Sequence, residues 1–399
     1  MINTNESLTF FTLFILFNAL CAGIYSIIPI SGFGVVSYIF LFLLLFYLEC
    51  ENGFYLQKSR YSFICTFLWL TILLIWKQKG TISGLYSWFL GGLVFFLFSY
   101  IYKSPKKISI FIYITLIIAL LFALFEMLTG IHLPLSRFVK GSYNLKSFFG
   151  LNIPCFYFTN ENDFSAYLIL AFCFLRSVRY NEKKILDLFI LPVLLLILFV
   201  AGARLCLIGL FIYYLYFFFM KLERRIRLVG SICISFVSLF LFIKVFLPYI
   251  TNLQNIQSTK SIVIRTNLFL LSLKNIFIEK NYIGLGPASF PTIVDLDAGT
   301  GTIIDPHNWF MELGVEAGVF FLILYLLFIV LYFKYEFYKP YKAFFIVFLI
   351  CNFCSSRFCG ILWNWFFLSF FIYRFYFLRN NKTQESIHAH NISSAITTR

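Results

Sequence analysis

Apolar runs long enough to cross a lipid bilayer recur along this chain, and short charged or turn-forming stretches separate them. A transmembrane helix needs about 20 consecutive, mostly apolar residues. Runs of this kind lie near 7–28, 33–49, 61–76, 82–102, 108–128, 163–178, 185–201, 204–220, 227–249, 307–333, 341–358 and 360–378. The pattern predicts an all-α polytopic integral membrane protein with about 12 transmembrane helices.

The composition excludes the other broad classes of protein. Hydrophobic residues make up 61% of the 399 residues and charged residues 12%, whereas soluble domains have about 45–50% and about 25%. A soluble globule of this size has too little interior for so much apolar surface, and disorder requires low hydrophobicity. In a soluble protein the net charge of +15 would suggest a nucleic-acid partner. Here the basic residues cluster between apolar runs, so we expect no such partner.

Lys and Arg are distributed unevenly between the predicted loops. The even-numbered loops hold sixteen of them, and the short odd-numbered loops hold four. Because cytoplasmic loops carry the excess of Lys and Arg, we expect both termini in the cytoplasm. We interpret 1–379 as a single transmembrane domain and 380–399 as a disordered cytoplasmic tail.

Two long loops then face outward, near 129–162 and 250–306. Within the second loop, residues 262–278 have the pattern of an amphipathic helix, with Arg265 on its polar face. A helix of this kind can lie on the outer leaflet.

The segment Asp305-Pro306-His307-Asn308 opens the tenth apolar run. Asp is a favoured N-cap and Pro is favoured at the first helical position. We therefore expect the tenth helix to begin here, at the outer face, with His307 in its first turn. The positive end of the helix favours an anion and a neutral imidazole that can accept a proton. The alternative is that His307 is an interfacial histidine with no functional role.

Asn308, Glu312 and Glu316 follow at a spacing of four and are predicted to share one face of this helix. Carboxylates among apolar neighbours must face the protein interior, water or a basic partner. For Glu316 a buried structural role is equally well supported. Glu312, one turn nearer the outer face, is the better functional candidate.

Two arginines on the outward side are candidates for binding an anion. Arg204 follows the turn Ala201-Gly202-Ala203 between two apolar runs, where a lone arginine needs an anionic partner or a water-filled cavity. Arg265 lies on the polar face of the loop helix. The alternatives are snorkelling to lipid headgroups for Arg204 and a solvated surface charge for Arg265.

Asn160, Asn162 and Asp163 precede the sixth apolar run, where Asn and Asp favour a helix start. The predicted orientation places them outside as well. Polar elements from distant parts of the chain therefore meet one membrane face, together with the loop that carries Arg265. We predict an outward-facing site with two arginines, one histidine and carboxylates.

Several short motifs, taken in order, resemble the shared domain of bacterial O-antigen ligases and polymerases. The segments are FTNENDFSAYL at 158–168, ARLCLIGL at 203–210, Arg265, GLGPASF at 284–290 and HNWFMELGVEAG at 307–318. The resemblance covers about 150–333, and the first segment is similar to the polysaccharide-polymerase branch. The chain departs from the family at Leu205-Cys206, where small or hydroxyl residues are common.

The resemblance implies a GT-C-like, inverting glycosyltransferase in the bacterial cytoplasmic (inner) membrane. Its donor would be a glycan on undecaprenyl pyrophosphate at the outer leaflet, and an acceptor hydroxyl would attack the anomeric carbon. Arg204 and Arg265 would hold the pyrophosphate, while His307 or Glu312 would take the acceptor proton. The supporting residues would be Asn308, Asn160, Asn162 and Asp163.

No Asp-x-Asp metal motif accompanies these residues, since Asp295 and Asp297 are interpreted as solvated loop residues. We expect neither a metal nor another cofactor in the transfer. The implied partners are the undecaprenyl-pyrophosphate-linked oligosaccharide, a glycan or lipid A-core acceptor, and membrane lipids. Proteins that regulate chain length or flip the lipid-linked glycan are further implied partners.

Three functions stay open at this point. A polymerase extends lipid-linked repeat units, and the similarity of 158–168 favours it. A ligase transfers the finished glycan to a lipid A-core acceptor. A flippase or transporter of the lipid-linked glycan is expected to show charged residues at mid-membrane in several spans and repeat symmetry, and neither is evident in the sequence.

Overall fold

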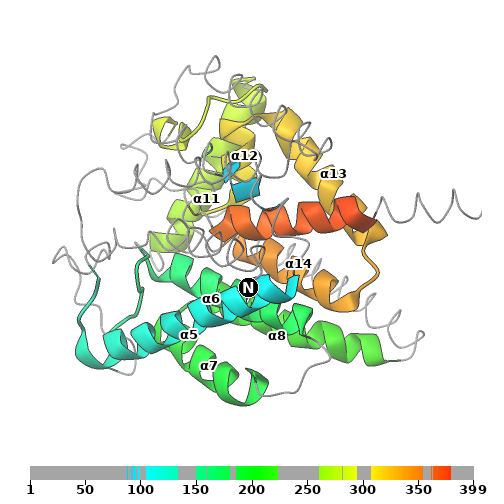
Figure 1. Cartoon of the computed structure of the whole chain (residues 1–399). Coiled ribbons are helices and arrows are strands. Elements are labelled where there is room, and N and C mark those ends of the chain that lie inside the picture. Colours follow the sequence, from blue (N-terminus) through cyan, green and yellow to red (C-terminus); the bar gives the residue numbers. More distant parts are fainter. Residues whose placement is uncertain are drawn as a thin grey trace, which may run out of the picture.

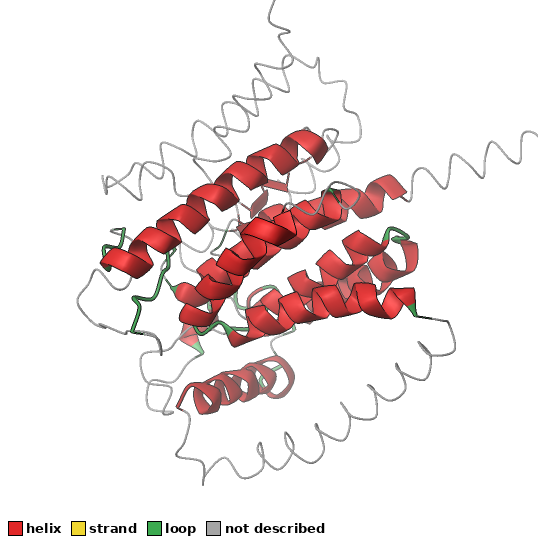
Figure 2. Cartoon of the chain, turned by 90° about the horizontal axis from the view of Figure 1, so that it is seen from below, coloured by secondary structure: helices red, strands yellow, loops and turns green. Residues whose placement is uncertain are grey.

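The computed structural model of this chain describes residues 88, 91, 92, 94, 95, 98, 105–133, 150–158, 160–179, 186–222, 260–280, 282–293, 307–353, 361 and 363–378. Within these residues the structure is helical and contains no β-strand (Figure 2), which confirms the predicted all-α class. The predicted spans 7–28, 33–49, 61–76 and 227–249 and the tail 380–399 lie outside the described residues. The number of transmembrane helices therefore stays a prediction.

The described helices are α5 (Pro105–Thr129), α6 (Glu161–Val178), α7 (Leu191–Val200), α8 (Arg204–Lys221), α11 (Lys260–Leu273), α12 (Trp309–Glu316), α13 (Val319–Tyr335), α14 (Lys339–Cys351) and a last helix over 363–378. π-helical turns precede α7 at Leu186–Ile190 and extend α11 at Lys274–Ile278, and a 3-10 turn covers Phe290–Thr292. Two segments of the described chain, Ile108–Thr129 and Arg204–Lys221, are long and apolar enough to cross a membrane.

The helix α6 is buried over most of its length, and α5, α8 and α14 pack against it (Figure 1). At the end of α6, Arg179 donates to the hydroxyl of Ser109 near the start of α5 (3.2 Å). Ser177 donates to the carbonyl of Pro340 at the start of α14 (2.9 Å). Both neighbours therefore run antiparallel to α6, so the first residues of α6 lie at the same end of the bundle as the last residues of α5 and α14.

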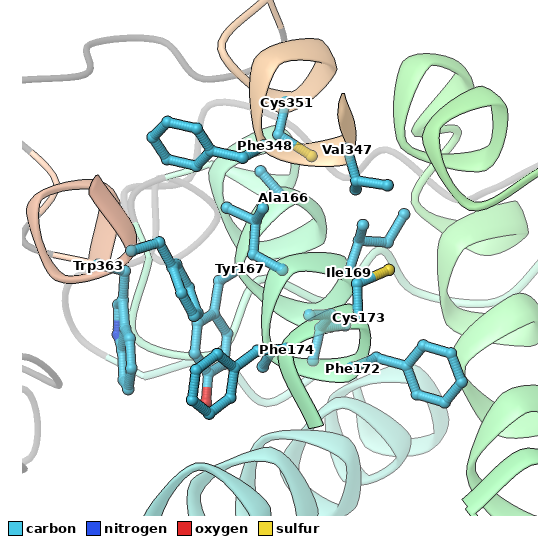
Figure 3. Close-up of a cluster of buried hydrophobic side chains, with 14 of the residues drawn as sticks. Ala166, Tyr167, Ile169, Phe172, Cys173, Phe174, Val347, Phe348, Cys351 and Trp363 are labelled. Atoms are coloured by element: carbon cyan, nitrogen blue, oxygen red, sulfur yellow. The ribbon is translucent and has the colours of Figure 1, made fainter. Parts of the chain in front are cut away.

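Aromatic side chains fill the space between α6, α14 and the last helix (Figure 3). Tyr167 packs on Trp363 with ring centroids 4.5 Å apart, and Phe174 packs on Phe367 at 6.1 Å. The indole N–H of Trp363 also forms a hydrogen bond with the hydroxyl of Tyr157. Because lipid tails are as apolar as these rings, close packing and hydrogen bonds hold such helices together, rather than the hydrophobic effect.

The single helix predicted over 307–333 is wrong, because the structure divides it into α12 and α13 at Gly318. Gly318 has φ 88° and ψ 172°, a backbone conformation that is essentially restricted to glycine. The loop around Gly284 inserts against this break. The N–H groups of Leu285 and Gly286 donate to the carbonyls of Val315 (2.9 Å) and Glu316 (3.0 Å), and Val319 N–H donates to the carbonyl of Tyr282 (2.9 Å). These contacts satisfy backbone groups that the break would otherwise leave unpaired.

We expect Gly318→Ala to destabilise the protein by about 2 kcal/mol or more, because the backbone conformation alone costs about 1–3 kcal/mol for a non-glycine residue. A Cβ at Gly318 would also collide with the carbonyl of Tyr282, which belongs to the inserted loop. The melting temperature of the detergent-solubilised protein measures the effect. Gly209→Ala in α8 is the control, since a Cβ there makes only ordinary contacts with Val347 and Ile350 at 3.7 and 3.6 Å. An equal, small effect of both substitutions would contradict the proposed role of the break.

The loop helix predicted over 262–278 is observed as α11 with its π-helical extension, at Lys260–Leu273 and Lys274–Ile278. The expected exposure of its polar stripe is wrong at two positions, because Ser272 and Asn275 are buried. The helix packs on α12, and a Cβ at Gly314 of α12 would crowd Ile276. The exposed side instead carries large apolar residues, Phe269, Leu270, Phe277 and Ile278. The buried side of this helix therefore mixes polar and apolar residues, since Leu268 and Ile276 are buried as well.

Candidate active site

The segment before α6 forms the helix cap that its sequence predicts. Asn160 has an extended backbone, and its side-chain oxygen accepts from the N–H groups of Asn162 and Asp163, both at 2.9 Å. The Asp163 side chain is buried, whereas Asn162 is partly exposed. A single amide thus orients the start of α6.

The start of α12 differs from the prediction. The helix begins at Trp309, and the cap is Asn308, whose side chain accepts from the N–H groups of Phe310 (3.0 Å) and Met311 (3.4 Å). His307 precedes the helix in the left-handed region, with φ 47°. That backbone turns the chain away from the helix axis, so helical geometry cannot extend back to the predicted cap, Asp305, which lies outside the described residues.

His307 is thus in the turn that leads into the helix and not in the first helical turn. Its side chain is partly buried. A non-glycine residue with positive φ is uncommon, and such residues concentrate at functional sites where the surrounding structure holds them. The position keeps His307 beside the start of α12. The expected effect of the helix end on its imidazole stays a prediction.

The two carboxylates of α12 are both buried, with exposed fractions of 1% for Glu312 and 2% for Glu316. Glu316 accepts from the indole N–H of Trp88 (3.3 Å) and from the backbone N–H of Phe290 (3.4 Å). It therefore links α12 to a residue far earlier in the chain and to the inserted loop, as expected for a structural role. Glu312 lies one turn closer to Asn308 and is the carboxylate nearer the start of the helix.

Arg204 is the first residue of α8 and is exposed. The turn before it contains Gly202, whose φ of 66° and open surroundings let the chain reverse between α7 and α8. Arg265 lies on α11 and is partly exposed. In the described part of the chain, neither arginine forms a hydrogen bond or an ion pair with His307 or Glu312.

Contacts between helices place several of these segments at one end of the bundle. The N–H of Trp309 donates to the carbonyl of Asn352 (3.1 Å), which ties the start of α12 to the end of α14. The side chain of Asn352 donates to the hydroxyl of Tyr325 in α13 (3.2 Å). The start of α6 lies at the same end, as does the start of α8, since Gly209 contacts the last turn of α14. A joint function of these segments in one site stays a prediction.

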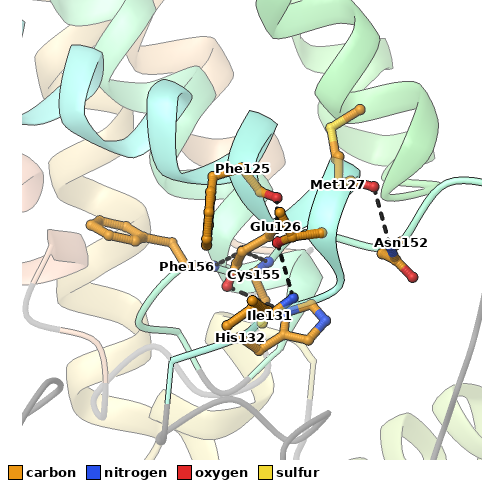
Figure 4. A network of polar contacts seen from close by, with 9 residues as sticks. Phe125, Glu126, Met127, Ile131, His132, Asn152, Cys155 and Phe156 are labelled. Carbon is orange, nitrogen blue, oxygen red and sulfur yellow. Dashed lines mark hydrogen bonds and ion pairs between the residues drawn. The ribbon is translucent and has the colours of Figure 1, made fainter.

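A second polar cluster, which the sequence did not predict, lies at the end of α5 (Figure 4). Glu126 is buried, and one carboxylate oxygen accepts from the N–H groups of Cys155 (2.9 Å) and Phe156 (2.7 Å). Its other oxygen lies 3.3 Å from Nδ1 of His132. Asn152 donates its side-chain amide to the carbonyl of Met127 (3.2 Å). The available signal was a carboxylate at the end of an apolar run, where charged groups are rare and functional.

Residues 189–326 match the protein family described as O-antigen ligase. The matched segment contains Arg204, Arg265, His307 and Glu312. Over this segment the chain is similar to the O-antigen ligase family, which confirms the resemblance that the motifs indicate.

A particular protein is also similar over most of the chain, namely the teichuronic acid biosynthesis protein TuaE of Bacillus subtilis (strain 168). The two sequences are 23% identical over 303 residues, which is 70% of this chain. The chain spans 61% of the length of this relative. No solved structure matches the chain. We therefore infer the function of the whole protein from its candidate site together with these similarities.

Proposed function

We propose that this protein is a multi-spanning membrane glycosyltransferase of cell-surface polysaccharide assembly, with about 12 transmembrane helices in a GT-C-like arrangement. The match of residues 189–326 to the O-antigen ligase family carries the proposal. The similarity to a protein of teichuronic acid biosynthesis supports it. The donor is an oligosaccharide repeat unit on undecaprenyl pyrophosphate, at the outer face of the bacterial cytoplasmic membrane.

The reaction is a displacement at the anomeric carbon of the donor. The acceptor hydroxyl oxygen forms the new glycosidic bond, and the bond from the anomeric carbon to the pyrophosphate breaks with inversion. The bonding electrons leave with undecaprenyl pyrophosphate, and the hydroxyl proton passes to a base on the protein. No electron acceptor or metal is needed to balance this step.

The candidate residues supply what this displacement requires. Arg204 and Arg265 bind the pyrophosphate and stabilise the negative charge that grows on it, because a guanidinium offers paired donors to phosphate oxygens. His307 accepts the hydroxyl proton, and Glu312 either accepts it instead or holds the imidazole. The caps at Asn308 and Asn160 fix the helix starts beside which these groups lie.

A polymerase is the first form of this proposal, because 158–168 resembles the polymerase branch. A ligase that transfers the finished glycan to a lipid A-core acceptor is the second, because the matching family is described as O-antigen ligase. The surface polysaccharide of a deletion strain, separated on a gel, distinguishes them. Single repeat units on the core indicate a lost polymerase, and bare core with polymer left on the lipid carrier indicates a lost ligase. Absence of any lipid-linked product outside the membrane would indicate a flippase and contradict both forms.

The outward-facing site also requires the orientation that the Lys and Arg distribution predicts. Reporter fusions at Lys103, Arg225 and Lys339 are expected to report a cytoplasmic location, and fusions at Lys140 and Asp297 an external one. An external signal at Arg225 would reverse the orientation and move the start of α12 to the cytoplasmic face, where the proposed donor is not used.

A further inference from the structure

The polar cluster at the end of α5 brings together three side chains that are metal ligands in other proteins. They are the carboxylate of Glu126, the imidazole of His132 and the thiol of Cys155, and one ligand atom from each lies within 4.8 Å of the other two. Glu126 and Cys155 are buried, and the side chain of His132 is 11% exposed. The cluster is thus largely buried, and His132, its most exposed member, lies next to Glu126 and Cys155 (Figure 4).

The spacing of the nitrogen and oxygen ligands fits a small tetrahedral ion. Nδ1 of His132 and Oε1 of Glu126 are 3.3 Å apart. Two ligands bound to Zn²⁺ at about 2.0–2.1 Å in tetrahedral geometry are separated by about 3.3–3.4 Å. The sulfur of Cys155 lies within 4.8 Å of a ligand atom of each of the other two residues. A zinc–sulfur bond of about 2.3 Å implies a separation of about 3.6 Å from a nitrogen or oxygen ligand, so a shift of at most about 1 Å completes the site.

The surroundings also resemble the outer shell of a metal site. The second oxygen of Glu126 accepts the N–H groups of Cys155 and Phe156, which leaves Oε1 directed toward the imidazole. Hydrogen bonds of this kind orient carboxylate ligands in metalloproteins. Phe156 has φ 50°, an unusual backbone for an aromatic residue, and such strain persists where the structure over-determines the position.

We propose that Glu126, His132 and Cys155 form a binding site for one borderline divalent transition-metal ion, with Zn²⁺ as the expected ion. One oxygen, one nitrogen and one sulfur ligand exclude Mg²⁺ and Ca²⁺, which prefer oxygen ligands alone. The ion would fasten 150–158 to the end of α5, a few residues before the Asn160 cap. It stabilises structure and takes no part in the transfer, so this inference is independent of the proposed function.

Cobalt is the probe for this site, because its thiolate complexes absorb in the near ultraviolet. Full-length protein in detergent is treated with a chelator and titrated with Co²⁺. We expect one Co²⁺ per chain, a cobalt–thiolate absorption band, and loss of the band when Zn²⁺ is added. Cys155→Ser should abolish the band, whereas Cys173→Ser, which removes a buried thiol within α6, should retain it. His132→Ala and Glu126→Gln should each weaken Co²⁺ binding at least tenfold.

A thermal measurement on the wild-type protein tests the site without relying on variants, which could fail to fold. Stoichiometric Zn²⁺ should raise the melting temperature of the chelator-treated wild type, and the same concentration of Mg²⁺ should not. Absence of a thiolate band in the wild type, or a band that persists in Cys155→Ser, would overturn the proposal. A melting temperature unaffected by Zn²⁺ would do the same, and the cluster would then be a hydrogen-bonded Glu126–His132 pair alone.

Discussion

His307→Ala is expected to lower the rate of polymer formation by about 10²–10⁴-fold, the usual effect of removing a positioned proton acceptor. His307 directly precedes the Asn308 cap of α12, and a side chain at this position is the candidate proton acceptor of the proposed reaction. The measurement is polymer yield from lipid-linked repeat units in reconstituted membranes, compared at equal protein level.

Two further variants separate chemistry from backbone effects at this position. His307→Asn keeps a side chain that tolerates the left-handed backbone, so a loss of activity in this variant points to the missing imidazole. His388→Ala, in the predicted cytoplasmic tail, is the control and should leave polymer yield unchanged. If His307→Ala produces wild-type chain lengths while Glu312→Gln abolishes them, the base is Glu312 and His307 has no part in the transfer.

Arg204→Lys and Arg265→Lys are each expected to lose most of the activity, although charge and membrane insertion are preserved. A guanidinium binds pyrophosphate oxygens through paired donors in a planar fork, whereas an ammonium offers a point charge. Donor affinity should fall as well, because the interaction exists before the reaction and strengthens as the lipid pyrophosphate leaves.

Arg137 and Arg357 provide the matched controls for these two substitutions. Both are predicted to lie outside the membrane and away from the family motifs, so their replacement by Lys should be tolerated. If Arg204 and Arg265 tolerate Lys equally well, both residues only snorkel or sit in solvent. The anion-binding assignment would then fail, and the proposed enzyme would be supported by family resemblance alone.

The existence of the described helices followed from the apolar pattern, but their ends did not. Asp305 and Asn308 are both good N-caps, and local propensity gives Asp305 the advantage because a proline follows it. The observed helix is capped by Asn308 and begins at Trp309 because of the backbone at His307 and the hydrogen bond from Trp309 to Asn352. Both are consequences of tertiary packing, which a single sequence does not contain.

The break at Gly318 was missed for a related reason. In an apolar run, a glycine is equally compatible with close helix approach and with an interrupted helix. The deciding partner is the loop around Gly284, more than 30 residues earlier in the chain. The burial of side chains on α12 was easier to predict than the helix ends. The spacing of Glu312 and Glu316 and their apolar neighbours indicate one shared face, and both carboxylates are buried.

The pair Glu126 and His132 shows a polar contact that the sequence hinted at but did not predict. A carboxylate at the end of an apolar run signals a partner, but the partner atoms are mostly backbone N–H groups of Cys155 and Phe156. Every residue except proline has a backbone N–H, so the sequence does not show which of them donates to a given carboxylate. Only the histidine six residues later was visible, and its spacing alone matched no known motif.

The backbone hydrogen bonds between the inserted loop and the α12–α13 break limit how this protein can be recombined with its relatives. The N–H groups of Leu285 and Gly286 donate to carbonyls at the end of α12. A chimaera that joins the loop of one protein to the helix of another would therefore leave these carbonyls without their donors. The smallest transferable unit therefore runs from the start of α11 at Lys260 to beyond Val319. Exchanging that unit between homologues would move the inserted loop and the helix break together, as one inherited module.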